Sequence, residues 1–405
     1  MTKYELKKIF SRMSNKMALV LLVFITGIIC YFATNVSYVN KNGDTKTGRK
    51  AVLALKTEQK QWSGYLDKEK IQKVIAKNRA IAELRKALPD GGKEKEITYS
   101  KGQGIMDIRE LLNCSYADEF RSYDYYKADS LTEDDASNFY DNRISLLKNW
   151  LNSEAKSQFS KEEKTYLIKQ YEKISVPFYY DYMKGWIQLF EFAPTVIMIT
   201  MLILGYLVAG IFSNEFLWKA DTLFFTAQYG RNKAVLAKIK AGFCMITVLY
   251  FGVFLLFTGI TLVYLGVDGW NLSVQVDFGS WKCFYNIKIW QKYLVIMIGG
   301  YIGCFFLSSL SMFVSAKTKS AVLAVMLPFI VIFLPSFIEN LNSPIVNKIL
   351  GLLPDQLLQI GNVLNYFNLY SLGGGVIGAL PILLVLYTVL TAILFPVIYW
   401  EYRRK

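Results

Sequence analysis

Residues 214–242 read NEFLWKADTLFFTAQYGRNKAVLAKIKAG and separate two apolar runs, 192–213 and 243–267. The connector holds five basic and two acidic side chains: Glu215, Lys219, Asp221, Arg231, Lys233, Lys238 and Lys240. Short loops rich in lysine and arginine stay on the cytoplasmic side of a membrane. The stretch therefore predicts a cytoplasmic connector between two membrane spans, and this sets the orientation of the rest of the chain.

The apolar spacing inside this connector predicts one α-helix over residues 214–229. Its first face is apolar and comprises Phe216, Ala220, Leu223, Phe224 and Ala227. Its second face is mixed and comprises Trp218, Asp221, Phe225 and Gln228. Asn214 is the expected N-cap and Gly230 the expected C-terminal stop. Such a helix either docks on a partner protein or lies on lipid headgroups, and the pattern leaves both interpretations open.

Composition places the whole chain in a membrane. Of its 405 residues, 53% are hydrophobic and 19% are charged, and the apolar residues gather in runs. The net charge of +14 comes from bases that flank these runs instead of forming one stripe. A membrane surface explains this arrangement better than nucleic acid does, so we expect membrane lipids and no nucleic acid among the partners.

The sequence contains no motif for chemistry. It has five cysteines and no histidine, and its cysteines form no CxxC pair or clustered set, so neither a disulfide framework nor a zinc site is indicated. Walker A, Gly-x-Ser-x-Gly and HExxH patterns are also absent. We therefore expect no catalytic residue, no metal site and no cofactor bound by this chain.

Six apolar runs are long enough to cross a membrane. They are residues 17–35, 187–213, 241–266, 293–315, 320–339 and 376–400. With both termini inside, the cytoplasmic pieces carry fifteen lysines and arginines and the short outer loops carry four. The sequence thus predicts an all-α polytopic protein with six transmembrane helices, a cytoplasmic amphipathic helix over 1–16 and a cytoplasmic tail over 401–405. The first run is favoured as a retained anchor over a cleaved signal peptide.

A long hydrophilic insert, residues 36–186, follows the first span. It holds 27 lysines and arginines and 23 acidic residues, with a helical apolar stripe over 64–88. Capping boxes are expected at Ser130 and Ser160. These features predict a mainly helical, folded extracellular domain. The uncharged residues 356–375 are rich in polar side chains and glycine, which favours an interfacial or re-entrant segment over a seventh span.

The connector also carries a family resemblance. The order of Glu215, Asp221-Thr222, Gly230-Arg231 and Lys238 resembles the cytoplasmic loop of ABC type-2 export permeases. That family has an acidic residue, a Gly-Thr-like helix, a Pro-x-x-Arg-like turn and a lysine that opens the third span. Here the turn lacks the proline, and Asp221-Thr222 stands where Gly-Thr is usual. The six-span arrangement extends the resemblance over the chain outside the large insert.

The resemblance implies the membrane subunit of an ABC exporter in the bacterial cytoplasmic membrane. Two such permeases, identical or sisters, pair with separate ATPase subunits that hold ATP and magnesium, so this chain is not itself an enzyme. Residues 214–229 would form the coupling helix. The implied ATPase-coupling residues are Glu215, Trp218, Asp221, Phe225, Arg231 and Lys238. The resemblance does not indicate which of the family's substrates this chain would export.

Two other functions stay open. A mechanotransmitting permease acts on cell-envelope substrates without carrying them, and also has a large outer domain after its first span, but typically has four spans. A membrane-anchored sensor or scaffold would have no transport role and no ATPase partner. A carrier driven by an ion gradient fits less well, because carboxylates are nearly absent from the spans, with Glu191 and Glu339 at outer ends.

The predicted orientation can be tested by thiol labelling. Lys317 and Lys319 should face the cytoplasm, whereas Asp90-Gly91 and Asn271 should face outside. Single cysteines at these positions, in a chain without the native cysteines, would be treated with a membrane-impermeant thiol reagent on whole cells. We expect labelling at 91 and 271 only; labelling at 317 but not at 91 would overturn the orientation.

Overall fold

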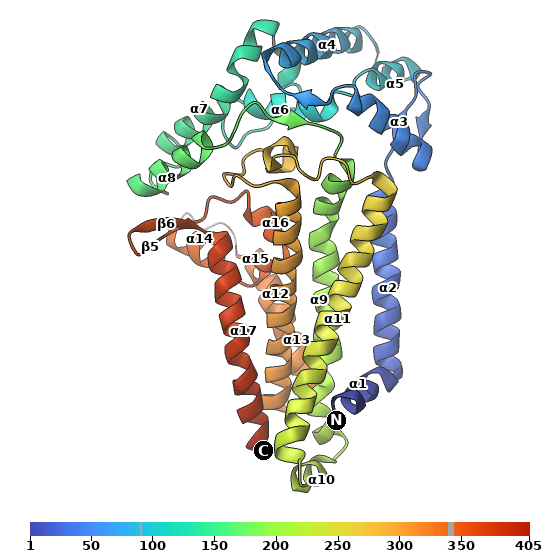
Figure 1. Ribbon diagram of the computed structural model, residues 1–405, viewed down its shortest axis with the longest axis vertical. Coiled ribbons are helices and arrows are strands. Elements are labelled where there is room, and N and C mark those ends of the chain that lie inside the picture. The colour runs from blue at the N-terminus through green and yellow to red at the C-terminus, as the bar shows by residue number, and fades with distance from the viewer. Residues whose placement is uncertain (90, 339–343) are drawn as a thin grey trace.

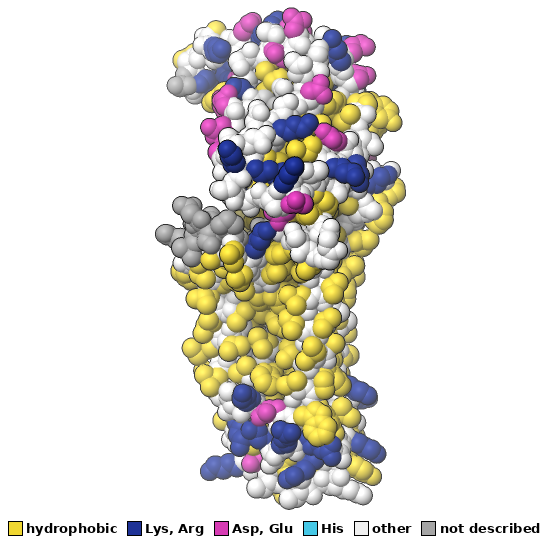
Figure 2. Space-filling model, turned by 90° about the vertical axis from the view of Figure 1, so that its left-hand side faces the viewer, with side chains coloured by type: hydrophobic (Ala, Val, Ile, Leu, Met, Phe, Trp, Pro, Cys, Tyr) yellow, Lys and Arg dark blue, Asp and Glu magenta, His cyan; other side chains and the backbone are white. Residues whose placement is uncertain are grey.

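Five long apolar helices form the body of the protein. The computed structural model describes residues 1–89, 91–338 and 344–405, so the predictions made for Asp90 and Glu339 lie outside the described residues. The five helices are α2 (Met13–Thr34), α9 (Lys184–Leu217), α11 (Val235–Leu265), α12 (Ile289–Thr318) and α17 (Ala379–Arg403). Each is long and apolar enough to cross a membrane. Figure 2 shows the broad hydrophobic band that they present, with lysines and arginines at its lower border. The chain is a mostly helical, multi-pass membrane protein.

The predicted span over 320–339 is shorter than expected. Its α-helix, α13, covers Ala321–Phe333, and a 3₁₀ turn, η6, continues it over Leu334–Phe337. Pro335 lies at the start of this turn and has no N–H to donate, which explains why the α-helix ends there. Thirteen α-helical residues rise about 20 Å and the 3₁₀ turn about 8 Å more, close to the ~30 Å of a bilayer core.

Both chain ends lie at the same end of the bundle, which we call the basal end (Figure 1). The N-terminal helix α1 covers Thr2–Ser11, shorter than the predicted 1–16, because the chain turns at Arg12, whose backbone is extended. At the other terminus, Tyr402 donates from its hydroxyl to the backbone oxygen of Phe212 over 3.2 Å. The connectors after α9 and after α12 lie at this end too.

The long insert forms a mainly helical upper domain at the opposite end (Figure 1). Its helices are α3 (Arg49–Lys60), α4 (Lys68–Lys86), α5 (Lys93–Ser100), α6 (Met106–Ser115), η1 (Lys127–Ser130), η2 (Glu133–Asn138), α7 (Phe139–Asn152) and α8 (Lys161–Glu172). Two short antiparallel pairs accompany them, β1 (Tyr38–Val39) with β2 (Thr45–Lys46), and β3 (Gly64–Tyr65) with β4 (Tyr179–Tyr180). The capping box at Ser160 is confirmed. The one predicted at Ser130 is wrong: Thr132 and Asp135 form it two residues later.

The upper domain packs tightly on the loop between α11 and α12, residues 266–288, which contains the turns η4 (Val274–Val276) and η5 (Phe278–Ser280). Arg143 of α7 is 4% exposed and donates to the backbone oxygens of Trp281 (3.2 Å) and Cys283 (3.1 Å). Asp268 forms ion pairs with Lys56 and Lys60 of α3 at 2.5 and 2.7 Å. The apolar core therefore runs without a break from the upper domain into the bundle.

Residues 344–378 contain no helix long enough to span a membrane. They hold α14 (Pro344–Leu350), α15 (Asp355–Leu358), α16 (Ile360–Val363) and an antiparallel hairpin of β5 (Leu369–Leu372) and β6 (Gly375–Gly378). The short helices lie against α12 where it has glycines. A Cβ on Gly299 would lie 2.5 Å from Ile360, and one on Gly303 would lie 2.9 Å from Leu357. Glycine therefore allows this segment to enter the side of the bundle, as small residues do in membrane helices.

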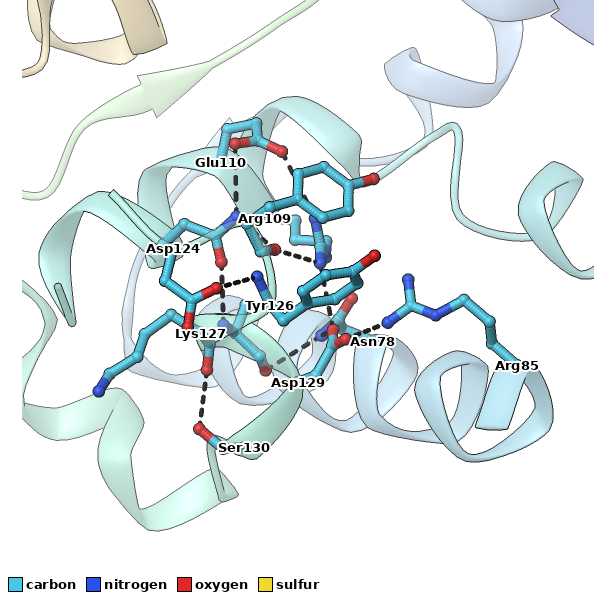
Figure 3. Close-up of polar contacts among 12 residues, drawn as sticks. Asn78, Arg85, Arg109, Glu110, Asp124, Tyr126, Lys127, Asp129 and Ser130 are labelled. Atoms are coloured by element: carbon cyan, nitrogen blue, oxygen red, sulfur yellow. Dashed lines mark hydrogen bonds and ion pairs between the residues drawn. The ribbon is translucent and has the colours of Figure 1, made fainter. Parts of the chain in front are cut away.

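A buried ion-pair cluster holds three parts of the upper domain together (Figure 3). The carboxylate of Asp129 on η1 accepts from Asn78 of α4 (3.0 Å) and from Arg109 of α6 (3.2 Å). It is also paired with Arg85 of α4. Arg109 donates in addition to the backbone oxygen of Tyr125 at 2.6 Å. Because Asp129 is the shared acceptor, its charge is what keeps α4, α6 and η1 in register.

We expect Asp129→Asn to destabilise the upper domain. The change keeps the side-chain volume but takes this carboxylate from Arg85 and from Arg109, which keeps only its contact with Glu110 at 3.4 Å, and breaking a buried pair costs about 3 kcal/mol or more. The measurement is thermal unfolding of the detergent-solubilised full chain, followed by far-ultraviolet circular dichroism. Glu69→Gln is the control, because its pair with Lys73 is exposed, and it should leave the melting temperature unchanged. Equal melting temperatures for both variants would contradict the role given to Asp129.

Candidate functional site

The helix α1 meets the end of α9 and the start of α11 at the basal end. Ile9 turns inward and is 7% exposed, while Glu5 and Lys8 stand three residues apart on one side of the helix. Amphipathic spacing thus presents one apolar and two charged side chains to the bundle. This is where the structure gathers two of the residues that the sequence predicted for coupling, Glu215 and Lys238.

These two residues form the centre of a buried network, which we call the basal ion-pair cluster: Glu5, Lys8, Glu215 and Lys238. The ammonium of Lys238 donates to Oε1 of Glu215 (2.6 Å), Oε2 of Glu5 (3.1 Å) and the backbone oxygen of Ile211 (3.1 Å). Lys8 reaches the same Glu215 oxygen at 2.5 Å. Lys238 is 0% exposed and Glu215 is 5% exposed. All three ammonium protons have acceptors, as burial of a lysine requires.

Aromatic rings cover this cluster. Lys8 and Arg12 lie 5.0 and 4.4 Å from the ring centre of Trp218, and Lys238 lies 5.2 Å from that of Phe224. Contacts of this kind strengthen as water is excluded. Partial burial lowers the pKa of the Arg12 guanidinium, while the nearby Tyr206 and Glu215 raise it, and the group stays charged at any physiological pH.

The prediction of one continuous helix over 214–229 is wrong. The helix α9 continues through Asn214 to Leu217, so Asn214 is not an N-cap. Lys219 then takes a left-handed conformation with φ of 54°, and the separate α10 covers only Asp221–Thr226. Positive φ interrupts a helix because it turns the backbone out of the helical path. Trp218 at the end of α9 and Phe225 on α10 therefore do not share one helix face.

Gly230 has a role that differs from the expected helix stop. It begins a π-helical turn, η3 (Gly230–Ala234), that leads into α11. A Cβ at this position would lie 1.7 Å from the backbone oxygen of Phe224, so only glycine allows α10 to fold back this closely. The turn fixes α10 directly against the first residues of α11.

The remaining predicted residues lie around α10. Phe225 is half-buried, with its ring 5.3 Å from that of Tyr402 and 6.1 Å from that of Phe216. Arg231 donates from Nε to the backbone oxygen of Phe225 at 3.4 Å. Asp221 is the first residue of α10, where a negative charge complements the helix dipole. Phe225 thus contributes to an aromatic cluster of the protein itself and is not a free anchor.

Sequence reasoning missed the contribution of α1 to this site. Glu5 and Lys8 complete the cluster, and Tyr402 completes the aromatic packing from the far end of the chain. One signal was available, since Glu5 is the only acidic residue among positions 1–16. An acid retained in such a basic helix indicates a buried cationic partner, although the sequence does not say which one.

Among the described residues, no group of His, Cys, Asp and Glu could hold a metal ion. Four large apolar side chains are exposed around α10: Leu217 by 72%, Leu223 by 75%, Trp218 by 48% and Tyr229 by 43%. They stand among exposed polar side chains such as Lys219 and Lys233. No family model, curated protein or solved structure matches the chain. The functional assignment therefore depends on the contacts and exposed side chains at the basal end.

We expect Glu215→Gln to release α1 from the bundle. The change removes the carboxylate that pairs with both Lys8 and Lys238 and leaves a buried lysine with Glu5 as its only charged partner, at a cost of about 3 kcal/mol. Hydrogen exchange of the α1 amides should accelerate. Glu401→Gln, which breaks a more exposed pair with Lys405 at the same end, should leave α1 exchange at the wild-type rate. Unchanged exchange in Glu215→Gln would show that the cluster does not hold α1.

Proposed function

We propose that this chain is the membrane-spanning subunit of an ABC exporter, moved by a separate ATPase that docks on α10. The observation that carries the proposal is the basal ion-pair cluster next to an exposed apolar surface. Leu223 offers a partner a hydrophobic contact. Packed rings join α10 to α17 and α9, and the contact of Lys238 with the Phe224 ring joins it to α11. A docking surface that is rigidly connected to several spans suits a device that converts movement into transport.

Force on α10 has two routes into the bundle. Phe224 and Phe225 pack on Tyr402, which links α10 to α17, and Phe225 also meets Phe216 of α9. The second route runs through the turn η3 into α11, where Lys238 holds α9 and α1. Because buried ion pairs separate only at high cost, the ends of α1, α9 and α11 move as one body.

The distribution of charge supports an energy source outside the chain. In the five long helices, the acidic and basic side chains lie within about two turns of the helix ends. Ion-driven carriers place such groups in the membrane interior. Asp355 is an exception outside these helices: it lies on α15 beside α12, is 8% exposed, and its Oδ1 has no partner among the described residues.

The proposal includes a topology and an assembly. The helix α13 would serve as the sixth span, the basal end would face the cytoplasm of a bacterial cell with both termini inside, and the upper domain would be extracellular. A second permease, identical or a sister, would complete the transport path, with ATP and magnesium on the ATPase. In this arrangement the upper domain, joined to the bundle by Arg143 and Asp268, would shape substrate release.

The docking surface is tested by comparing Leu223→Ala with Val322→Ala. Leu223 is 75% exposed on α10, and Val322 is 67% exposed on the apolar α13. Removing an aliphatic anchor from an interface costs up to about 2 kcal/mol, or roughly thirtyfold in affinity. Leu223→Ala should therefore lose co-purification of the ATPase and the ATP hydrolysis that depends on this chain, whereas Val322→Ala should retain both.

The same preparation separates the competing functions. A sensor or scaffold predicts that the wild-type chain itself supports no ATP hydrolysis in proteoliposomes. A mechanotransmitting permease predicts coupled hydrolysis with no substrate accumulated in the vesicle lumen. A carrier driven by an ion gradient predicts that Asp355→Asn abolishes transport while hydrolysis by any associated ATPase is unaffected.

A further inference from the structure

A cavity of about 170 Å³ lies at the basal end beside the ion-pair cluster. Its walls come from α1, the first turn of α2, the last three turns of α9 and the start of α13. The charged side chains of the lining are Glu5, Lys8 and Arg12, and Asn214, Ala321 and Val325 also line it. The lining combines charged and polar side chains with apolar ones, so the cavity suits a molecule with a charged group and a hydrophobic tail.

The guanidinium of Arg12 borders this cavity without an acceptor. It stacks on Trp218, and within the part of the chain that the structure describes it makes no hydrogen bond and no ion pair. The nearby carboxylate of Glu215 is already paired, because Lys8 and Lys238 share it. Five N–H groups of Arg12 are therefore available, in the planar arrangement that matches a phosphate.

Asn214 supplies a second polar group. The residue is 9% exposed, and its side chain lines the cavity and forms no hydrogen bond with any described residue. Gly210, one turn earlier on α9, keeps the space open, since a Cβ there would lie 2.6 Å from Nδ2 of Asn214 and 3.2 Å from Nη1 of Arg12. A polar group bound in the cavity would give this amide a hydrogen-bond partner.

Charge and position identify the class of ligand. Three cations, Lys8, Arg12 and Lys238, face two carboxylates, Glu5 and Glu215, so the junction carries one positive charge in excess. This excess of positive charge favours the binding of an anion. On the other side, α13 leads from Ala321 and Val325 to outward-facing apolar side chains: Val322, Leu323 and Met326 are 67%, 49% and 51% exposed.

We infer that this cavity binds the phosphate of an anionic membrane lipid. Arg12 and the amide of Asn214 hold the phosphate, and the acyl chains lie along α13 in the leaflet at the basal end. Arginine and phosphate form short, charge-assisted hydrogen bonds that a neutral headgroup contact lacks. The inference rests on the membrane character of the bundle and does not require an ATPase partner.

Lipid binding would be measured on the purified full chain in detergent, by native mass spectrometry and by the shift in melting temperature. The probes are phosphatidylglycerol, phosphatidylcholine and inorganic phosphate, each at matched concentration. The variants are Arg12→Gln and, as control, Lys16→Gln, which removes an exposed positive charge near the same turn but outside the cavity lining. Gly210→Leu is a third variant that fills the cavity and keeps every charge.

We expect phosphatidylglycerol to bind and to raise the melting temperature of the wild type and of Lys16→Gln. Binding should weaken by about tenfold in Arg12→Gln, the loss expected for a charged hydrogen bond, and also in Gly210→Leu. Equal binding of phosphatidylglycerol to all four proteins, or equal stabilisation by phosphatidylcholine, would overturn the site. Equal stabilisation by inorganic phosphate would overturn the lipid and identify a free-phosphate site. Should Arg12→Gln fail to fold, Gly210→Leu decides the outcome.

Discussion

A lysine without exposed surface needs a carboxylate beside it, and this need organises the basal end of the protein. Lys238 finds its partners on two other elements, Glu215 on α9 and Glu5 on α1. Removing Glu215, which pairs with both Lys8 and Lys238, would leave the buried Lys238 with Glu5 alone, at a cost of about 3 kcal/mol. The first helix of the chain is therefore positioned by electrostatics, whereas apolar packing alone would leave an amphipathic helix free to slide along a membrane surface.

At the opposite end of the bundle, a buried lysine is again paired with a carboxylate. Lys292, at the start of α12, is 5% exposed and donates to Asp277 (2.9 Å) and Ser280 (2.6 Å) in the loop that carries the upper domain. Between the two ends, glycines at 299, 300 and 303 allow α12 to approach its neighbours closely. Ion pairs hold the two ends of the bundle, and close backbone packing holds its middle.

The features that could be predicted from the sequence are those determined by residues close together in the chain. The length of an apolar run determines whether a helix can span, so α2, α9, α11, α12 and α17 followed from composition alone. Ser160 was recognised as a helix start because its partner lies three residues away. The left-handed Lys219 and the close approach at Gly230 gave no such signal, since tertiary contacts impose them. Glu5 and Lys238 are 233 positions apart, and nothing in either neighbourhood identifies the other.

The break at Arg12 connects the ion-pair cluster with the inferred lipid site. Its extended backbone ends α1 and starts α2, and the two cations that contact the Trp218 ring, Lys8 and Arg12, have different partners. Both cations line the cavity, but Lys8 is paired with Glu215, whereas Arg12 makes no ion pair with any described residue and would be neutralised by the inferred lipid phosphate. A phosphate bound at Arg12 would lie beside the ion pairs that hold α1, because Arg12 and Lys8 contact the same Trp218 ring and line the same cavity. On this reasoning, the charge of the surrounding leaflet would set how firmly α1 transmits movement to α9 and α11.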